Sequence, residues 1–259
     1  MKKKLRIIKI GGNVIDDAVK LDAFLGDFAQ MEGLKILVHG GGKLATQLSK
    51  KLGIDPQMVK GRRITSGKDL ETVIMVYAGL INKTITGKLQ ARGCNAMGLS
   101  GADANTILAK KRSVRPIDFG WVGDIKAVNE TAIHTFLQQQ ITPVFCSLTH
   151  DGKGHLLNTN ADTIAAELAI GMSLLYETEL IYCFEKKGVL ANVADENSVI
   201  TYIDSARYHE LKQQNVIAEG MLPKMENCFY ALKNKVSKVV IGNTDVIKNN
   251  SEHFTTLTL

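Results

Sequence analysis

Two glycine clusters, each directly after an apolar run, are the residues of this sequence best suited to binding anions. Gly11 and Gly12 follow the run IIKI, and Gly40, Gly41 and Gly42 follow ILVH. Glycine lets backbone N–H groups approach an anion unobstructed, and a helix starting at that point adds favourable partial charge. Two such loops at one edge of a parallel sheet would hold two anionic groups close together.

Two lysines occupy positions that are costly without an anionic partner. Lys9 lies inside the apolar run that precedes the first glycine pair, where an ammonium group is unfavourable unless it meets an anion. Lys224 follows Pro223 in the first turn of an expected helix, where a cation opposes the helix dipole. Both lysines are therefore candidates for contact with a phosphate or carboxylate group.

Three Asx residues cluster at an expected strand-to-helix turn in the stretch LLNTNADTIAAELA. Asn158, Asn160 and Asp162 occupy alternate positions there. A helix cap requires only one such side chain. We therefore expect at least some of the three to contact a ligand.

The GGGK run permits two other interpretations. A P-loop would need a glycine where Leu37 stands and Ser or Thr where Leu44 stands, so that motif is excluded. The pattern from Gly40 to Ala45 fits the loose dinucleotide-binding form GxGxxA, although no acidic residue ends a strand about twenty residues further on. A dinucleotide-dependent enzyme therefore stays open as an alternative.

Strands that alternate with helices must position these residues. Continuous apolar runs predict strands covered on both faces, and the alternation predicts an α/β three-layer αβα sandwich around a central, mostly parallel sheet. No linker interrupts the chain, so we expect one domain, 1–259, with lobes of about 1–174 and 175–259. The expected elements are strands at 5–10, 35–39, 142–146, 155–158, 178–184, 237–242, in CNAMGLS and in the tail TTLTL, hairpins near 56–66 and 105–129, and helices at 16–31, 42–53, 68–92, 160–172, 203–214 and 222–235.

Composition narrows the class of protein. The 259 residues are 45% hydrophobic, enough for a full core, and no apolar run has the length of a membrane span. The net charge of +6 comes from scattered lysines without the aromatic and basic clusters of RNA-binding proteins, which favours a phosphate-rich small ligand over nucleic acid. The four cysteines show neither disulfide nor zinc-ligand spacing, so we expect a reduced, cytoplasmic protein without a metal site of its own.

The ordered set KIGGN, VHGGGK, GRRIT, GLSGAD, FGWVGDI, LLNTNAD, KKGVL and EGMLPK resembles the amino-acid kinase superfamily, specifically its acetylglutamate kinase branch. KIGG marks only the superfamily, whereas HGGG, GRRIT and NTNAD narrow the resemblance to the branch. The similarity runs from about residue 6 to the C-terminus. It implies the amino-acid kinase fold and the transfer of a phosphoryl group from ATP to a carboxylate.

The resemblance also implies roles for individual residues. Lys9 and Lys224 would stabilise the transferring phosphoryl group, and Asp162 would hold both ammonium groups. The acceptor would bind at Gly41, Gly42, Arg63, Asn158 and Asn160, with Arg63 on its second carboxylate and Asn158 on its amide. The nucleotide would bind at Gly11, Gly12, Glu185, Lys186, Lys187, Gly188, Val189, Leu190, Val216, Ile217 and Ala218. Mg²⁺ would be held mainly by the nucleotide phosphates.

One departure affects the nucleotide site, because the usual TDVxGV loop reads CFEKKGVL here, with Glu185 in place of Asp. The acceptor carboxylate is ionised at neutral pH, so no general base is required, and His39 is expected to be structural. The acyl pocket is expected along 60–66 and 121–129, including Trp121.

The expected activity is ATP-dependent phosphorylation of the γ-carboxylate of N-acetyl-L-glutamate, giving N-acetyl-L-glutamyl 5-phosphate for arginine synthesis. The alternatives are the same reaction on another N-acylglutamate, such as N-succinyl-L-glutamate, or a non-catalytic module that senses a nucleotide or binds a partner. Members of the resembled family that arginine inhibits usually carry an extra N-terminal helix that builds hexamers, whereas this chain starts only a few residues before its first strand. The resemblance therefore implies an arginine-insensitive homodimer, which we expect to be built through the 68–92 helix.

Overall fold

The computed structural model describes residues 2–59, 61–217, 221–248 and 253–259. Its centre is an eight-stranded sheet in the order β12-β14-β13-β11-β1-β2-β8-β5, in which only the β13–β14 pair is antiparallel. The strands are β1 Lys4–Ile10, β2 Leu34–His39, β5 Ala96–Leu99, β8 Thr142–Phe145, β11 Glu177–Cys183, β12 Tyr202–Ile203, β13 Lys238–Gly242 and β14 Thr255–Leu257. The prediction of a mostly parallel central sheet is confirmed.

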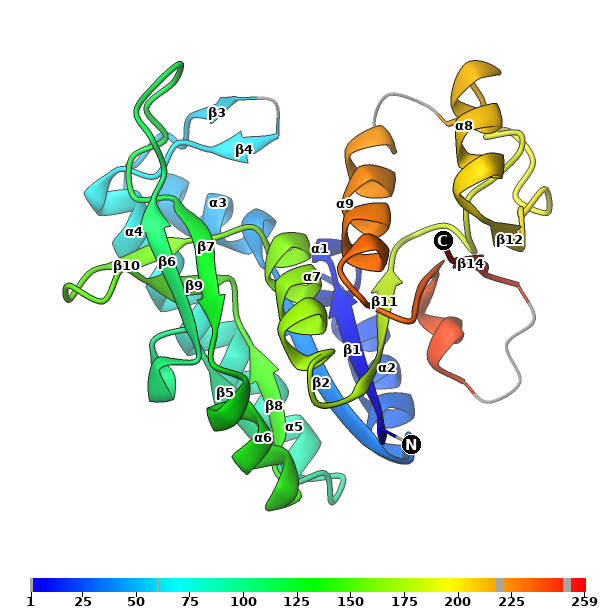
Figure 1. Cartoon of the computed structure of the whole chain (residues 1–259). Coiled ribbons are helices and arrows are strands. Elements are labelled where there is room, and N and C mark those ends of the chain that lie inside the picture. The colour runs from blue at the N-terminus through cyan, green and yellow to red at the C-terminus, as the bar shows by residue number, and fades with distance from the viewer. Residues whose placement is uncertain (1, 60, 218–220, 249–252) are drawn as a thin grey trace.

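Helices cover both faces of this sheet, as the continuous apolar strands predicted (Figure 1). Along β1, Leu5 and Ile7 join the core beneath α7 (Ala161–Met172) and α9 (Leu222–Lys233). Ile8 and Ile10 join the core beneath α2 (Ala18–Gln30) and α5 (Asn82–Gln90). Because successive side chains of a strand alternate between faces, Lys9 points toward α7 and α9.

A second sheet, in the order β10-β9-β6-β7, lies beside the first and contains the predicted 105–129 hairpin as β6 (Ile107–Lys111) and β7 (Gly123–Val128). The strand expected at 155–158 is β10 (Leu156–Asn158), and it pairs with β9 (Leu148–His150) rather than with the central sheet. The predicted hairpin near 56–66 forms from β3 (Met58–Val59) and β4 (Arg62–Arg63). These short strands surround the polar turn before α7 (Figure 1).

Two long helices lie close to their predicted positions, and one short helix was missed. The helix expected at 16–31 is α2, which begins at Ala18 because the Asp17 side chain accepts hydrogen bonds from two backbone N–H groups. The separate α1 (Gly12–Ile15) lies before the predicted range. The helix expected at 68–92 is α4 (Gly67–Ile74), a π-helical segment at Met75–Ile81, and α5. Helix α6 (Glu130–Gln138) was missed, although Asn129 caps it and Ile133 and Leu137 form its buried face.

The remaining helices lie close to their predicted positions. They are α3 (Gly42–Lys51) and α8 (Ser205–Gln213), with short 3-10 turns at Asp103–Asn105 and Thr244–Ile247. None of the helices in the described ranges is both long enough and apolar enough to span a membrane.

Candidate active site

Two cavities of about 430 Å³ each meet at the carboxyl ends of the central parallel strands. Pocket A lies over β11 and β13 and extends from Gly11 to Leu190 and Ile217. Pocket B lies under β4 and the β6–β7 loop and extends from Gly40 to Arg112 and Asn158. Both pockets are lined by Lys9, Gly11, Gly12 and Asp162, so these four residues form the junction. A molecule bound in one pocket can therefore transfer a chemical group directly to a molecule bound in the other.

Lys9 and Asp162 form a close ion pair at this junction. The Lys9 Nζ lies 2.7 Å from Asp162 Oδ1, and the two side chains are only 10% and 22% exposed. Asp162 stands in the first turn of α7, next to the face of β1 on which Lys9 lies. The Tyr182 hydroxyl donates a hydrogen bond to the Asp162 carbonyl oxygen at 3.1 Å, which fixes this turn against β11.

Lys224 lines pocket A next to this junction, from the first turn of α9. Its Nζ lies 4.0 Å from the centroid of the Phe184 ring. Within the described ranges, Lys224 forms no ion pair with Asp162 or with any other carboxylate. The expectation that Asp162 holds both ammonium groups is therefore met for Lys9 alone, because the Lys224 ammonium lies over an aromatic ring instead.

The second glycine loop is packed so closely that it excludes side chains. A Cβ atom on Gly41 would lie 2.3 Å from Ile81 Cδ1 and 3.0 Å from Tyr77 Cδ1. Helix α3 begins at the next residue, and no described side chain caps it. The first N–H groups of an uncapped helix need an outside acceptor, so this end of pocket B is suited to a carboxylate or phosphate.

His39 supports this loop from below and is not placed for acid–base chemistry. The ring is fully buried, and burial lowers its pKa to about 4. In the neutral tautomer that fits both contacts, Nδ1 donates to the Gly40 carbonyl oxygen at 2.9 Å, and Nε2 accepts from the Asn82 amide at 3.1 Å. These contacts agree with the structural role predicted for His39.

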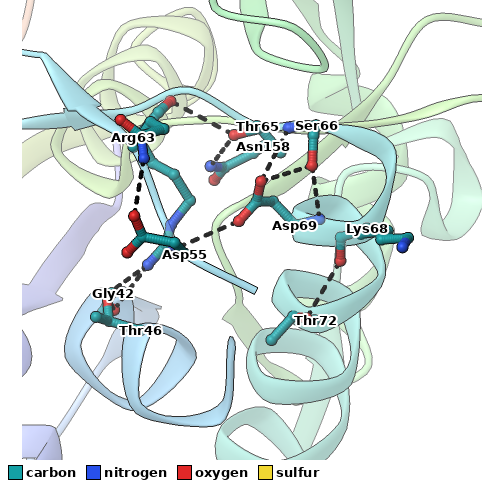
Figure 2. Close-up of polar contacts among 11 residues, drawn as sticks. Gly42, Thr46, Asp55, Arg63, Thr65, Ser66, Lys68, Asp69, Thr72 and Asn158 are labelled. Carbon is teal, nitrogen blue, oxygen red and sulfur yellow. Dashed lines mark hydrogen bonds and ion pairs between the residues drawn. The ribbon is translucent and has the colours of Figure 1, made fainter. Parts of the chain in front are cut away.

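Arg63 lines pocket B, and Figure 2 shows its polar contacts. Its Nη2 donates to Thr46 Oγ1 at 2.6 Å and to the Gly42 carbonyl oxygen at 3.2 Å. Its Nη1 lies 3.6 Å from Asp69 Oδ1, and these two buried atoms have no hydrogen-bond partner among the described residues. Asp69 is itself held by a capping box with Ser66 at the start of α4. The guanidinium is thus fixed in place in the wall of pocket B, with its buried Nη1 facing Asp69.

The two predicted asparagines have different roles in the wall of pocket B. Asn158 donates through Nδ2 to Thr65 Oγ1 at 3.0 Å, which leaves its carbonyl oxygen for other contacts (Figure 2). Asn160 lines the pocket but also caps α7, because its Oδ1 accepts from the N–H groups of Asp162 and Thr163. Its capping role accounts for part of the Asx cluster in this turn.

Most of the residues predicted for the nucleotide line pocket A. They are Gly11, Gly12, Glu185, Lys186, Gly188, Val189, Leu190, Val216 and Ile217. Lys187 does not belong to the described lining, and Ala218 lies outside the described residues. Sequence reasoning missed Phe184, Val193, Met221 and Ile241, which make the wall largely apolar. Such a wall suits the flat face of a base, and the glycine end suits phosphates.

The prediction for the acyl pocket is only partly met. Gly61, Arg62, Arg63, Val122 and Gly123 line pocket B, whereas Lys60 lies outside the described residues. Trp121 was expected in the lining but packs against His155, with ring centroids 5.0 Å apart, and the Lys111 Nζ lies 4.3 Å from the centroid of the Trp121 ring. Val122, the next residue along the chain, lines the pocket instead, and Tyr77, Arg112 and Phe119 were missed.

Comparison with known proteins gives a consistent result. A family model described as "Amino acid kinase family" matches residues 4–243. An acetylglutamate kinase of Cytophaga hutchinsonii is 54% identical over 240 residues, which are 92% of this chain and 91% of the relative. An acetylglutamate kinase of Bacteroides fragilis is 50% identical over 241 residues, which are 93% and 92% of the two chains.

Solved structures support the same fold. The smu.665 protein of Streptococcus mutans superimposes with a TM-score of 0.75 at 26% identity and covers 98% of both chains. A carbamate kinase of Giardia superimposes with a TM-score of 0.69 at 13% identity and covers 99% of both chains, and this likeness concerns the fold alone.

Proposed function

The chain belongs to the amino acid kinase family, and from this premise we propose that it transfers the γ-phosphoryl group of ATP to the γ-carboxylate of N-acetyl-L-glutamate. The product would be N-acetyl-L-glutamyl 5-phosphate, an intermediate of arginine biosynthesis. The observation that carries the proposal is the junction of two pockets at Lys9, Gly11, Gly12 and Asp162. Phosphoryl transfer requires such an arrangement, because donor and acceptor oxygens must approach in line.

ATP fits pocket A, with its base against the apolar wall and its phosphates at Gly11 and Gly12. The two ends of the pocket have the chemistry that the two ends of ATP require. No group of three or more His, Cys, Asp or Glu side chains suited to a metal occurs in the described part of the chain. Mg²⁺ would therefore be held mainly by the phosphates, where it neutralises charge.

The acceptor fits pocket B with its reacting carboxylate toward the junction. The free N–H groups at the start of α3 would contact that carboxylate, and the guanidinium of Arg63 would pair with the second one. Asn158 would contact the amide. A carboxylate with a pKa of about 4.3 is already a nucleophile at neutral pH, so positioning and charge compensation suffice.

Lys9 and Lys224 would stabilise the charge on the transferring phosphoryl group. Lys9 lies at the junction and is oriented by Asp162, and Lys224 lines pocket A next to it. Preorganised cations that lie close to developing charge are among the strongest contributors to catalysis, because they need not reorganise during the reaction.

The residues of pocket B come mainly from the part of the chain before about residue 174, and pocket A is completed by residues after it, which supports the proposed acceptor and nucleotide lobes.

Hydroxylamine trapping tests the proposal directly. An acyl phosphate reacts with hydroxylamine to give a hydroxamate, which forms a coloured complex with iron(III). We expect ATP-dependent hydroxamate with N-acetyl-L-glutamate and its loss in the Lys9→Met variant. The proposal would be wrong if no N-acylglutamate gave hydroxamate with the folded wild-type enzyme.

The arginines of pocket B favour a second candidate for the acyl group of the substrate, succinyl in place of acetyl. Arg62, Arg63 and Arg112 all line pocket B, although N-acetyl-L-glutamate has only one carboxylate besides the reacting one. N-succinyl-L-glutamate would supply another. Arg112 is partly satisfied by Asp124, to which Nε and Nη2 donate at 2.9 and 2.7 Å. Measuring kcat/KM for both acylglutamates decides between them.

We also propose a cytoplasmic homodimer. The helical segment from α4 to α5 exposes Met75 and Leu80, which are 50% and 61% accessible, and a second copy could cover them. All four cysteines are free thiols, which fits a reducing compartment. Light scattering after size-exclusion chromatography tests the dimer, and Leu80→Glu should shift the mass toward that of the monomer.

A further inference from the structure

The Phe184 ring lies in pocket A next to the junction and contacts both lysines of the proposed reaction. Its centroid is 4.0 Å from Lys224 Nζ and 5.7 Å from Lys9 Nζ. Ammonium groups at these distances are attracted by the negative face of an aromatic ring. Phe184 is therefore in contact with the two groups that would stabilise the phosphoryl group.

The structure holds this ring firmly in place. Phe184 follows β11 directly, and its backbone N–H donates to the Gly242 carbonyl oxygen at 2.7 Å. Its ring stacks on Tyr182, two residues earlier on the same face, with centroids 5.7 Å apart and planes 9° apart. Tyr182 is the register partner of Lys9 on β1. The two aromatic rings thus form a fixed surface beside the lysines.

The two lysines differ in their other partners. Lys9 has Asp162 at 2.7 Å, whereas Lys224 forms no ion pair within the described ranges. A second carboxylate near Lys224 would position it but would also repel an incoming phosphate and cancel the charge that catalysis needs. An aromatic ring attracts the ammonium and carries no net charge, so it positions the cation without this cost.

We propose that Phe184 is a positioning residue that holds the Lys224 ammonium, and secondarily that of Lys9, at the point of phosphoryl transfer. This inference rests on the proposed roles of the two lysines. The residue acts through the negative electrostatic potential of its ring face, in addition to its contribution to the apolar wall of pocket A. The turnover rate should therefore fall when electron density is withdrawn from the Phe184 ring, even if the shape of the ring hardly changes.

Graded fluorination of the Phe184 ring separates these two contributions. Phenylalanine carrying one, two, three or five fluorines is incorporated at position 184, and kcat and KM are measured for ATP and N-acetyl-L-glutamate. We expect kcat to fall stepwise with fluorination and the acceptor KM to change little, because the lysines act on the transition state. Phe184→Leu should lower kcat by about 3- to 30-fold, the range expected for a desolvated cation–π contact.

The same fluorinated residues at Phe145, fully buried on β8 two strands from β1, serve as the matched control and should leave kcat unchanged. A kcat that does not vary across the Phe184 series, while Lys224→Met abolishes turnover, would overturn the inference and leave the proposed function intact. If Lys9→Met and Lys224→Met both kept near-full turnover, the proposed roles of the lysines would fail first.

Discussion

Replacement of Arg63 by lysine tests whether pocket B binds a dicarboxylate acceptor. The guanidinium uses Nη2 for Thr46 and Gly42, and its Nη1 faces Asp69 without a hydrogen-bond partner among the described residues. A lysine would keep the positive charge beside Asp69. Its single ammonium group cannot reach all these partners and also bind a ligand carboxylate with fork geometry.

The expected size of the effect follows from one lost hydrogen bond between charged groups. Such a bond contributes about 1.5–3 kcal/mol. At about 1.4 kcal/mol for each factor of ten, the KM for the acceptor should rise by about 10- to 150-fold. The second carboxylate is remote from the reacting one, so its binding is the same in the ground state and the transition state, and kcat should change far less.

The assay couples ADP release to NADH oxidation at saturating ATP while the acceptor concentration varies. Arg6→Lys is a matched control, because Arg6 lies 3.5 Å from the buried Glu179 near the opposite end of β1 and lines neither pocket A nor pocket B. It should leave both kinetic constants unchanged, and thermal melts should show that both variants are folded. A large fall in kcat with an unchanged acceptor KM, or a rise confined to the KM for ATP, would refute the assignment of Arg63.

Three further predictions concern other parts of the chain. Lys9→Met and Lys224→Met should each lower single-turnover rates by about 10²- to 10³-fold with little change in KM, and a change confined to KM would contradict their role. Gly41→Ala should destabilise the fold by about 1–3 kcal/mol in urea titrations and impair acceptor binding, since its Cβ would collide with a buried side chain, whereas Gly67→Ala, with open space around it, should do neither. Burial by itself raises the pKa of Glu179, but its ion pairs with lysines on β1 and β13 bring that pKa below the ordinary value. The contribution of Glu179 to the free energy of unfolding is therefore present above about pH 4.5 and is lost as the pH falls through the lower pKa of the folded state. The difference in unfolding free energy between wild type and Glu179→Gln should therefore disappear in acid.

The central sheet could be predicted from sequence because its strands are buried on both faces. Runs such as LRIIKI and KILVH are continuous in apolar residues, and few other structures accommodate them. Helix α6 was missed since it is short and only Ile133 and Leu137 mark its buried face. Helix α2 was predicted from residue 16 and begins at Ala18, because the side chain of Asp17 caps it.

Candidate residues were predictable where burial of a charge or a backbone requirement constrained the residue type. Lys9 is costly in a strand, and Gly41 admits no Cβ, so both could be singled out without coordinates. Trp121 was placed wrongly because a hairpin loop does not reveal from sequence which of its alternate side chains faces inward.

Phe184 was the harder case, and its role depends on tertiary contacts alone. In the sequence it is one apolar residue after an apolar strand, with nothing to separate it from core residues such as Tyr182. Its contact with Lys224 is made only when α9 packs beside β11, about forty residues later in the chain. The substitutions that follow it in CFEKKGVL attract notice through their charge, yet Lys187 lies outside the described lining of pocket A, and Lys186 is paired with Glu196. Among the described residues of this loop, the uncharged Phe184 is thus the one whose ring contacts both Lys9 and Lys224.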